Sequence, residues 1–296
     1  MKIKTVIATL ATVAASGVAM LSHAADELVV GGKNFTEQQL LTSMTSQLLE
    51  AKGYNVDQRA GMGTAVLRKA QENGQIDMYW EYTGTTLINF NKITERMSPE
   101  AGYQKVKELD AKKGLVWLNP SKANNTYALA MRKDEAKKMG IETLSDLGKA
   151  LNGGKNLLFA CNAEFAARAD GLKPLQEEYG FKFKRSQIKR MDSGLTYQAL
   201  RDGQVNVSLV FATDGRIPAF DFVTLTDDRN YFPTYALTPV VRSETLKQFP
   251  KIEPLLNELS GRLDDQVMSR LNAQVDVSKE TIENVAKEFL TSQGLI

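Results

Sequence analysis

A unit of helix, turn and strand occurs twice in this chain, and this repeat constrains the fold more than any other feature. The first copy reads NGQID at 73–77, with Tyr82 five residues later, and the second reads DGQVN at 202–206, with Phe211 five residues later. In each copy an alanine precedes the glycine by four residues, and small polar residues follow the aromatic. Chance similarity between two common connections is the alternative, but the matched register favours two equivalent units.

Strand and helix patterns alternate around these units. Short apolar runs predict strands at 27–31, 76–80, 156–161 and 205–211. Helical spacing predicts helices at 36–52, 63–72, 144–151 and 196–201, with Ser145 as a cap for the third. Further helices are expected at 243–249, 252–260, 264–275 and 279–293. This alternation predicts an α/β protein with mostly parallel sheets.

Each copy of the repeat places its aromatic at the end of an expected strand. Ligands of open α/β sheets bind outside the carboxyl ends of the strands, so two lobes can clamp one ligand between Tyr82 and Phe211. Tyr79 and Trp80 lie inside the strand and are predicted to pack in the core. We predict a discontinuous first lobe, built from 26–125 and 236–296, and a second lobe at 126–235. No low-complexity linker separates them.

The N-terminal segment predicts export. Residues 1–24 begin with Lys2 and Lys4, continue through an uncharged apolar run and end in Ser22-His23-Ala24, with small residues at the positions a signal peptidase reads. The apolar run is shorter than the roughly 20 residues that a transmembrane helix needs. We therefore expect a cleavable signal peptide, a periplasmic protein and, since no cysteine lies near the cut, no lipid anchor.

Removal of this segment excludes several function classes. The remaining chain has 35 basic and 35 acidic residues and no histidine, because His23 is the only one. A balanced charge gives no electrostatic basis for nucleic-acid binding. The chain lacks the ligands of a histidine or cysteine-rich metal site, and Cys161 in LLFAC is predicted to be a small core residue. We expect no metal and no cofactor.

Other aromatic and polar residues follow apolar runs in loop-like positions. They include Tyr127 in NNTYALAMR, Tyr235 in YFPTYALTP and Lys33 in GGKNFTEQQ. Aromatic faces with few acids nearby suit a trimethylammonium cation, which has no N–H to donate and is attracted by ring quadrupoles. Lys33 and Arg168 have the charge to hold a carboxylate at the other end of such a ligand.

At these residues the chain resembles the substrate-binding proteins of osmoprotectant ABC transporters, the glycine betaine/carnitine/choline-binding family, over nearly all of its mature length. The order and spacing of the resembling segments are specific, although no single segment is. The segments are GGKNFTEQ at 31–38, EYTGT at 81–85, NNTYA at 124–128, AEFAARADGL at 163–172, FATDGRI at 211–217 and DDRNYFPTYALTPVV at 227–241.

The resemblance implies a two-lobed periplasmic-binding-protein fold of type II that binds a quaternary ammonium compound and delivers it to an ABC transporter permease. It implies an aromatic cage and a carboxylate subsite, and a binding protein that is not an enzyme. Relatives are often lipid-anchored, whereas this chain lacks the cysteine for an anchor. We expect a monomer. Phe211 stands where relatives often have tyrosine, so one hydroxyl is lost there. The implied cage residues are Tyr82, Tyr127, Phe211 and Tyr235, and the implied carboxylate ligands are Lys33, Thr85 and Arg168.

Three other functions remain open from the sequence. A two-lobed enzyme is one, although the absent histidine and the apolar setting of Cys161 disfavour it. A binding protein for an amino acid or a polyamine is another, and it needs acidic groups in the cleft to accept N–H donors. The available acids for that purpose are Glu37, Glu81, Glu164 and Asp214. A sensory adaptor that binds the same ligand is the third.

Overall fold

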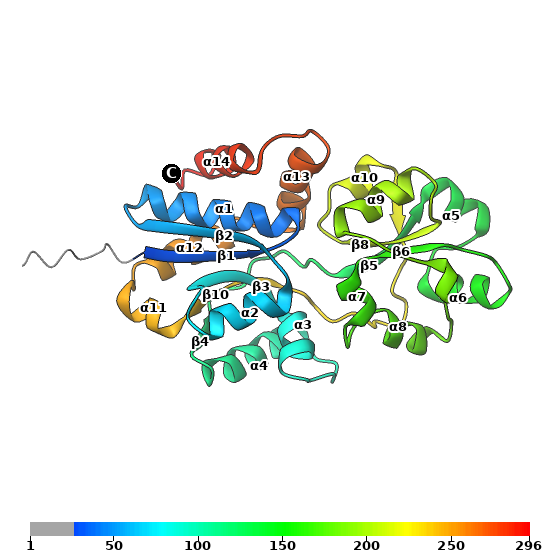
Figure 1. The fold of residues 1–296 in the computed structure, drawn as a ribbon, viewed down its shortest axis with the longest axis horizontal. Coiled ribbons are helices and arrows are strands. Elements are labelled where there is room, and N and C mark those ends of the chain that lie inside the picture. The colour runs from blue at the N-terminus through cyan, green and yellow to red at the C-terminus, as the bar shows by residue number, and fades with distance from the viewer. Residues whose placement is uncertain (1–26) are drawn as a thin grey trace, which may run out of the picture.

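The computed structural model describes residues 27–296, so the predicted signal peptide at 1–24 lies outside the described residues. The chain forms two lobes that lie side by side (Figure 1). Each lobe is a five-stranded sheet with helices against it. The predicted two-lobed α/β architecture is thus confirmed.

The first sheet has the strand order β2-β1-β3-β10-β4. Its strands are β1 (Glu27–Lys33), β2 (Asn55–Met62), β3 (Met78–Tyr82), β4 (Leu115–Trp117) and β10 (Leu237–Arg242). β1 is parallel to β2 and β3, while β10 is antiparallel to β3 and β4. Four strands therefore run in one direction and β10 runs against them, so the sheet is mostly parallel as predicted.

The second sheet repeats this arrangement in the order β7-β6-β8-β5-β9. Its strands are β5 (Tyr127–Arg132), β6 (Phe159–Cys161), β7 (Ile188–Arg190), β8 (Val207–Phe211) and β9 (Phe222–Thr224). β6 is parallel to β7 and β8, and β5 is antiparallel to β8 and β9. Each lobe therefore has one reversed strand beside its central strand.

The repeat found in the sequence is one matching part of these two lobes. α2 (Thr64–Glu72) leads into β3, and α9 (Ser193–Arg201) leads into β8. Every bound of the second unit lies 129 residues after the matching bound of the first. In each unit a glycine with positive φ, Gly74 or Gly203, turns the chain from the helix to the strand. The two copies are therefore equivalent structural units.

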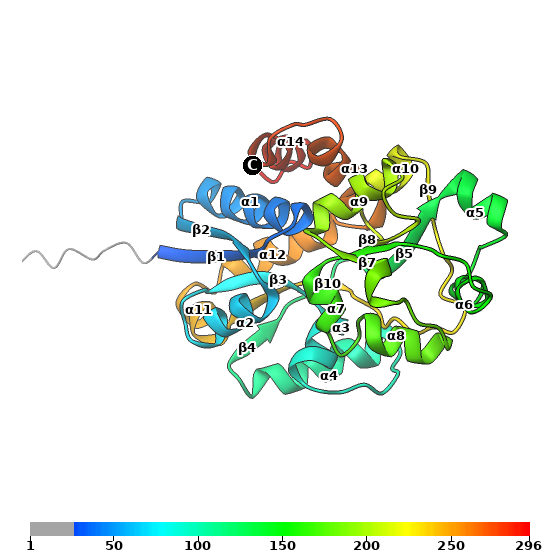
Figure 2. The same cartoon turned by 45° about the vertical axis from the view of Figure 1, so that its right-hand side comes forward.

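Helices complete both lobes. In the first, α1 (Thr36–Ala51) packs against the late helices α12, α13 and α14, which the second view also shows beside α1 (Figure 2). The other helices of the first lobe are α3 (Thr83–Thr85), η1 (Thr86–Phe90), α4 (Pro99–Ala111), α11 (Ser243–Gln248), α12 (Ile252–Gly261), α13 (Asp265–Asp276) and α14 (Ile282–Ser292). Those of the second lobe are α5 (Lys133–Met139), α6 (Leu144–Asn152), α7 (Ala163–Ala167), α8 (Leu172–Tyr179), η2 (Arg185–Gln187) and α10 (Arg216–Ala219).

One predicted helix cap is wrong. The cap of α6 is Thr143, not Ser145: the Thr143 hydroxyl accepts from the Asp146 N–H, and the Asp146 carboxylate accepts from the Thr143 N–H. Serine and threonine are both good caps, but only Thr143 has a carboxylate three residues later that closes a reciprocal capping box. The helix therefore begins at Leu144.

The core predictions are confirmed. Tyr79 and Trp80 are buried inside β3, and the Trp80 indole N–H donates to the Thr45 hydroxyl at 2.8 Å. Cys161 is buried and free, and burial raises the pKa of its thiol to about 11, so the thiol stays neutral at physiological pH. Within 27–296, no helix combines the length and the apolar character needed to span a membrane.

Candidate ligand-binding site

All seven residues predicted for the site line one small cavity between the lobes. This cavity, called the cage cavity here, has a volume of about 40 Å³. A buried water needs about 10–15 Å³ by this measure, so the cavity has room for roughly three waters. A ligand of more than a few heavy atoms therefore requires the lobes or the rings to separate. The seven residues are Lys33, Tyr82, Thr85, Tyr127, Arg168, Phe211 and Tyr235.

Sheet topology explains how the four cage aromatics meet. Tyr82 and Phe211 are the last residues of β3 and β8, which both end at the cleft. The reversed strands begin where their neighbours end, so Tyr127 opens β5 and Tyr235 lies two residues before β10. Tyr127 and Phe211 are direct cross-strand partners. Distant motifs thus converge because each lobe contains one antiparallel strand.

The aromatic rings contact one another in several orientations. The Tyr127 ring centroid lies 5.4 Å from that of Phe211 and 5.5 Å from that of Tyr235, with interplanar angles of 41° and 84°. Tyr82 is 5% exposed, Tyr127 9% and Tyr235 1%. The rings are therefore desolvated, which is the condition under which cation–π attraction is strongest.

Phe35 is an aromatic of this site that the sequence reasoning missed. Its ring stacks on Phe211 at 5.3 Å and 5°, and it lies 6.4 Å from Tyr82 at 22°. It belongs to the first lobe, at the N-cap of α1, and therefore bridges aromatics of both lobes. The signal that could have identified Phe35 is its position two residues after Lys33, within GGKNFTEQ.

Gly84 provides the space for one of the cage rings. A Cβ atom at this position would lie 2.9 Å from two ring atoms of Tyr235, which is buried and cannot move aside. We predict that Gly84→Ala lowers the free energy of unfolding by about 1–3 kcal/mol through overpacking and also weakens ligand binding. Chemical denaturation and titration of the same preparation measure both effects. Gly102→Ala is the matched control, because its Cβ meets no atom. Unchanged stability and affinity in Gly84→Ala would contradict the packing role.

Lys33 is paired within the protein. Its ammonium lies 2.5 Å from a Glu81 carboxylate oxygen, and both side chains are buried. The same ammonium lies 4.8 Å from the centroid of the Tyr82 ring. Glu81 also accepts from the Tyr79 hydroxyl at 3.0 Å. Lys33 therefore has a structural partner in addition to the predicted role toward a ligand carboxylate, which stays a prediction.

Arg168 is paired as well, and it connects the lobes. Its guanidinium donates two hydrogen bonds of 2.7 Å to Asp170 and one of 3.0 Å to Glu164. A fourth, of 3.2 Å, reaches the Thr85 hydroxyl in the first lobe. Burial alone would raise the pKa of Asp170, but the bonds and charge of Arg168 lower it below its ordinary value. Asp170 is thus a carboxylate at neutral pH.

The expectation of few acids near the cage is wrong. Glu81 and Asp170 accompany the two cations, and Glu37 is a third buried carboxylate beside the cage. Burial raises the pKa of Glu37 above its ordinary value, and hydrogen bonds from Thr213, Tyr82, Asn125 and Asn272 offset only part of that rise. The sequence offered Glu37 and Glu81 as candidate acids of the cleft, but it did not reveal their partners or the role of Asp170, because these contacts are tertiary.

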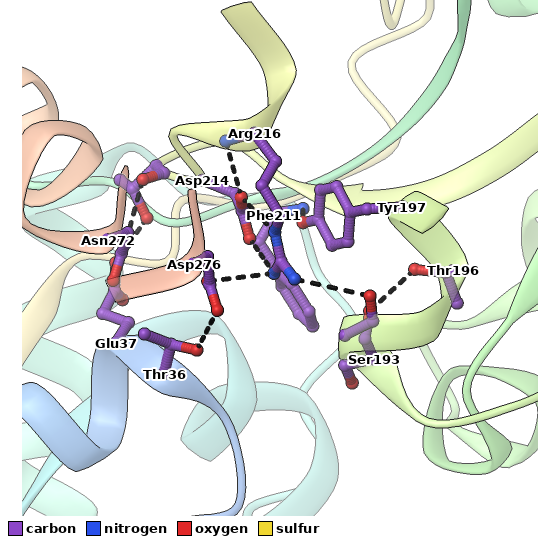
Figure 3. A network of polar contacts seen from close by, with 12 residues as sticks. Thr36, Glu37, Ser193, Thr196, Tyr197, Phe211, Asp214, Arg216, Asn272 and Asp276 are labelled. Atoms are coloured by element: carbon purple, nitrogen blue, oxygen red, sulfur yellow. Dashed lines mark hydrogen bonds and ion pairs between the residues drawn. The ribbon is translucent and has the colours of Figure 1, made fainter. Parts of the chain in front are cut away.

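A larger cavity adjoins the cage cavity. It has a volume of about 560 Å³ and shares Phe35 and Phe211 with it. On its wall, Arg216 is held between Asp214 at 2.6 Å and Asp276 at 3.2 Å, and its guanidinium lies 3.9 Å from the centroid of Tyr197 (Figure 3). Asp276 belongs to α13 of the first lobe, so this ion pair joins the lobes.

Comparison with known proteins identifies the family of the chain. The family model for the substrate binding domain of ABC-type glycine betaine transport systems, OpuAC, matches residues 26–292. The chain belongs to the OpuAC family. The resemblance drawn from the sequence motifs is thus confirmed, and the two-lobed fold is that of this family's solved members.

Individual members of the family cover nearly the whole chain. A glycine-betaine-binding protein of Pseudomonas aeruginosa is 45% identical over 278 residues, which is 92% of this chain and 89% of that protein. The glycine betaine-binding protein YehZ of Escherichia coli is 34% identical and covers 94% of each chain. A solved glycine betaine/carnitine/choline ABC transporter protein is 29% identical, with a TM-score of 0.74, over 90% of this chain and 99% of that one.

Proposed function

We propose that this protein binds a quaternary ammonium osmoprotectant of the glycine betaine, choline or carnitine class and delivers it to the permease of an ABC transporter. The observation that carries the proposal is the convergence of four aromatics on one cavity between the lobes. Two of them, Tyr127 and Phe211, come from the second sheet, and Tyr82 comes from the first. Membership of the OpuAC family supports the same function.

Within this proposal the cage residues hold the trimethylammonium group. Lys33, Thr85 and Arg168 line the same cavity and are proposed to receive the carboxylate of a zwitterionic ligand. Arg168 and Thr85 come from different lobes and are bonded to each other at 3.2 Å. A carboxylate bound to both would therefore favour the closed arrangement of the lobes.

The alternative of an amino acid or polyamine ligand has less support. Its N–H groups need free acceptors, yet each acid considered for that role is engaged by the protein. Glu37 takes four donors, and Glu81 pairs with Lys33. Glu164 pairs with Arg168, and Asp214 pairs with Arg216. A quaternary ammonium group has no N–H and so does not need them.

The relatives are substrate-binding parts of transporters, and we propose the same for this chain rather than an enzymatic activity. A periplasmic location after removal of the signal peptide and a monomeric state complete the proposal. The lobe boundaries at 125/126 and 235/236 are likewise proposed.

Calorimetric titration of the mature protein tests the proposed function. The ligands are glycine betaine, choline, carnitine, proline betaine and arginine. We expect saturable binding of at least one quaternary ammonium compound and none of arginine. Binding of arginine in preference to every quaternary compound would overturn the proposal in favour of the amino acid alternative.

Lobe closure on binding gives a further prediction. The lobes meet through bonds that span the cleft, including Thr64 to Glu164 at 3.0 Å and Asn89 to Asp170 at 3.1 Å. A ligand enters when the lobes are apart, and its contacts with both lobes then shift the population from open toward closed. Small-angle X-ray scattering should therefore show a smaller radius of gyration at saturating ligand. An identical radius with and without ligand would contradict the closure mechanism.

A further inference from the structure

We propose that Glu37 and Asp170 determine the specificity of the cage for quaternary over N–H-bearing cations, each acting through a cage tyrosine. This inference rests on the proposed function and names how the same site selects its ligand. Neither carboxylate lines the cage cavity. Each bonds to the hydroxyl of a cage tyrosine, and Glu37 also lines the larger adjoining cavity, so both act as positioning residues for a ligand in the cage.

The first pair is Tyr82 and Glu37. The Tyr82 hydroxyl donates to a Glu37 oxygen at 2.7 Å and accepts from the Gln38 amide at 3.1 Å. Both side chains are buried, at 5% and 3% exposure. A phenol that donates to a buried carboxylate has a more electron-rich ring, and the same bond fixes the direction in which the ring faces.

The second pair is Tyr235 and Asp170. The Tyr235 hydroxyl donates to an Asp170 oxygen at 2.6 Å, and both side chains are buried. The two pairs are independent in sequence, since one carboxylate comes from α1 of the first lobe and the other from the loop after α7 of the second. Two of the three cage tyrosines thus make the same bond.

The acceptor positions of both carboxylates are filled by protein donors. Besides Tyr82, Glu37 accepts from Asn125 at 2.7 Å, from Asn272 at 3.3 Å and from the Thr213 hydroxyl; Figure 3 shows the Asn272 bond. Besides Tyr235, Asp170 accepts twice from Arg168 and once from Asn89 at 3.1 Å. A carboxylate offers about four acceptor positions, so each is saturated.

Because protein donors fill the acceptor positions of both carboxylates, negative charge and hydrogen-bond acceptance, which a carboxylate usually offers together, act separately here. The negative charge of Glu37, whose donors are all neutral, still attracts a cation in this buried setting, whereas the charge of Asp170 is balanced by Arg168. No lone pair of Glu37 or Asp170 remains for a ligand N–H, so a protonated amine in the cage gains no hydrogen bond from either carboxylate. The cage therefore favours a fully methylated nitrogen.

Titration with cationic ligands and their neutral-head isosteres tests this inference. Choline is paired with 3,3-dimethyl-1-butanol, and glycine betaine with 3,3-dimethylbutanoate, in which a tert-butyl carbon replaces the nitrogen. For whichever pair binds, Glu37→Gln should lower the ratio of cation to isostere affinity by about three- to ten-fold. Tyr82→Phe, which keeps the carboxylate but breaks the bond, should lower it too. Gln has the same shape as Glu, and a turn of the Asn272 amide would bring its unpartnered oxygen toward the new N–H₂ group.

Asp110→Asn is the matched control. Asp110 is a buried carboxylate bonded to Arg68 and Trp117, and it lines neither cavity between the lobes. Its loss should lower the melting temperature without changing the ratio. An unchanged ratio in both Glu37→Gln and Tyr82→Phe would overturn the inference while leaving the proposed function intact.

The wild-type protein supplies the second readout. It should bind choline at least ten-fold more tightly than dimethylaminoethanol, or glycine betaine more tightly than dimethylglycine by the same factor, because the N–H of the tertiary amine cannot be accepted by Glu37 or Asp170. Equal affinities would overturn the role of acceptor saturation. If the wild type binds no quaternary compound at all, the proposed function and this inference both fail.

Discussion

Tyr82→Ala and Tyr235→Ala should each weaken binding of glycine betaine or choline by about five- to thirty-fold, which corresponds to about 1–2 kcal/mol. Each change removes a desolvated ring face from a cavity that four aromatics line together. Tyr→Phe at the same positions keeps the face and loses only the hydroxyl, so its effect should be smaller. Phe211→Tyr should preserve or tighten binding for the same reason. Titration calorimetry measures all five affinities against the wild type.

These variants need a control for lost stability, because Tyr82 and Tyr235 are also buried. Thermal melting without ligand should accompany each titration. Tyr103→Ala serves as the matched variant: Tyr103 is buried in the first lobe, its hydroxyl donates to the Leu118 carbonyl at 2.7 Å, and it lines neither cavity. Its melting temperature should fall while its affinity stays unchanged. Unchanged affinity in both Tyr82→Ala and Tyr235→Ala would show that the cage rings do not bind the ligand.

Lys33→Met should lower the free energy of unfolding by about 3–5 kcal/mol, because it leaves the Glu81 carboxylate buried without its cation. The double variant Lys33→Met/Glu81→Gln should recover most of that loss, since it removes both charges and keeps an amide oxygen as acceptor for the buried donors that Glu81 serves. Urea denaturation of the single and double variants measures these differences. Lys105→Met is the control, because the Lys105–Glu108 pair is solvent-exposed and contributes little.

The same double variant separates the structural role of Lys33 from its proposed role in binding. If Lys33 also receives a ligand carboxylate, the stable double variant should lose affinity for glycine betaine and keep affinity for choline, which has no carboxylate. An equal loss of affinity for glycine betaine and choline would show that Lys33 stabilises the structure of the site and does not bind the ligand carboxylate. Stability equal to the wild type in the single variant would contradict the buried ion pair itself.

Much of the fold was predictable from local pattern. The repeat at 73–82 and 202–211 located the two central strand ends, and the late helices showed regular apolar spacing. The N-cap of α6 was predicted wrongly because Thr143 and Ser145 are both residue types that cap helices well. Only the reciprocal bond with Asp146 distinguishes them, and that bond depends on where the helix starts.

The cage aromatics of the site were predictable, and Glu37 and Glu81 were named as candidate cleft acids, but the partners of these acids were not predictable. Tyr82 and Phe211 follow from the repeat, and Tyr127 and Tyr235 from segments shared with the family. Glu37 meets Tyr82 across 45 positions of sequence, a contact that no local pattern encodes. Lys33 presented the same difficulty, because its partner Glu81 lies 48 positions away. Charges in the sequence therefore indicated a carboxylate subsite without revealing that the cations were already paired.

The central claim is that a quaternary nitrogen sits among Tyr82, Tyr127, Phe211 and Tyr235. A crystal structure of the mature protein with arsenobetaine or arsenocholine, in which arsenic replaces that nitrogen, tests it most directly, because anomalous scattering locates the arsenic atom without reference to the protein. We predict one strong anomalous peak in the cage, within about 6 Å of the four ring centroids. A peak in the larger adjoining cavity alone, or elsewhere on the protein, would contradict the claim.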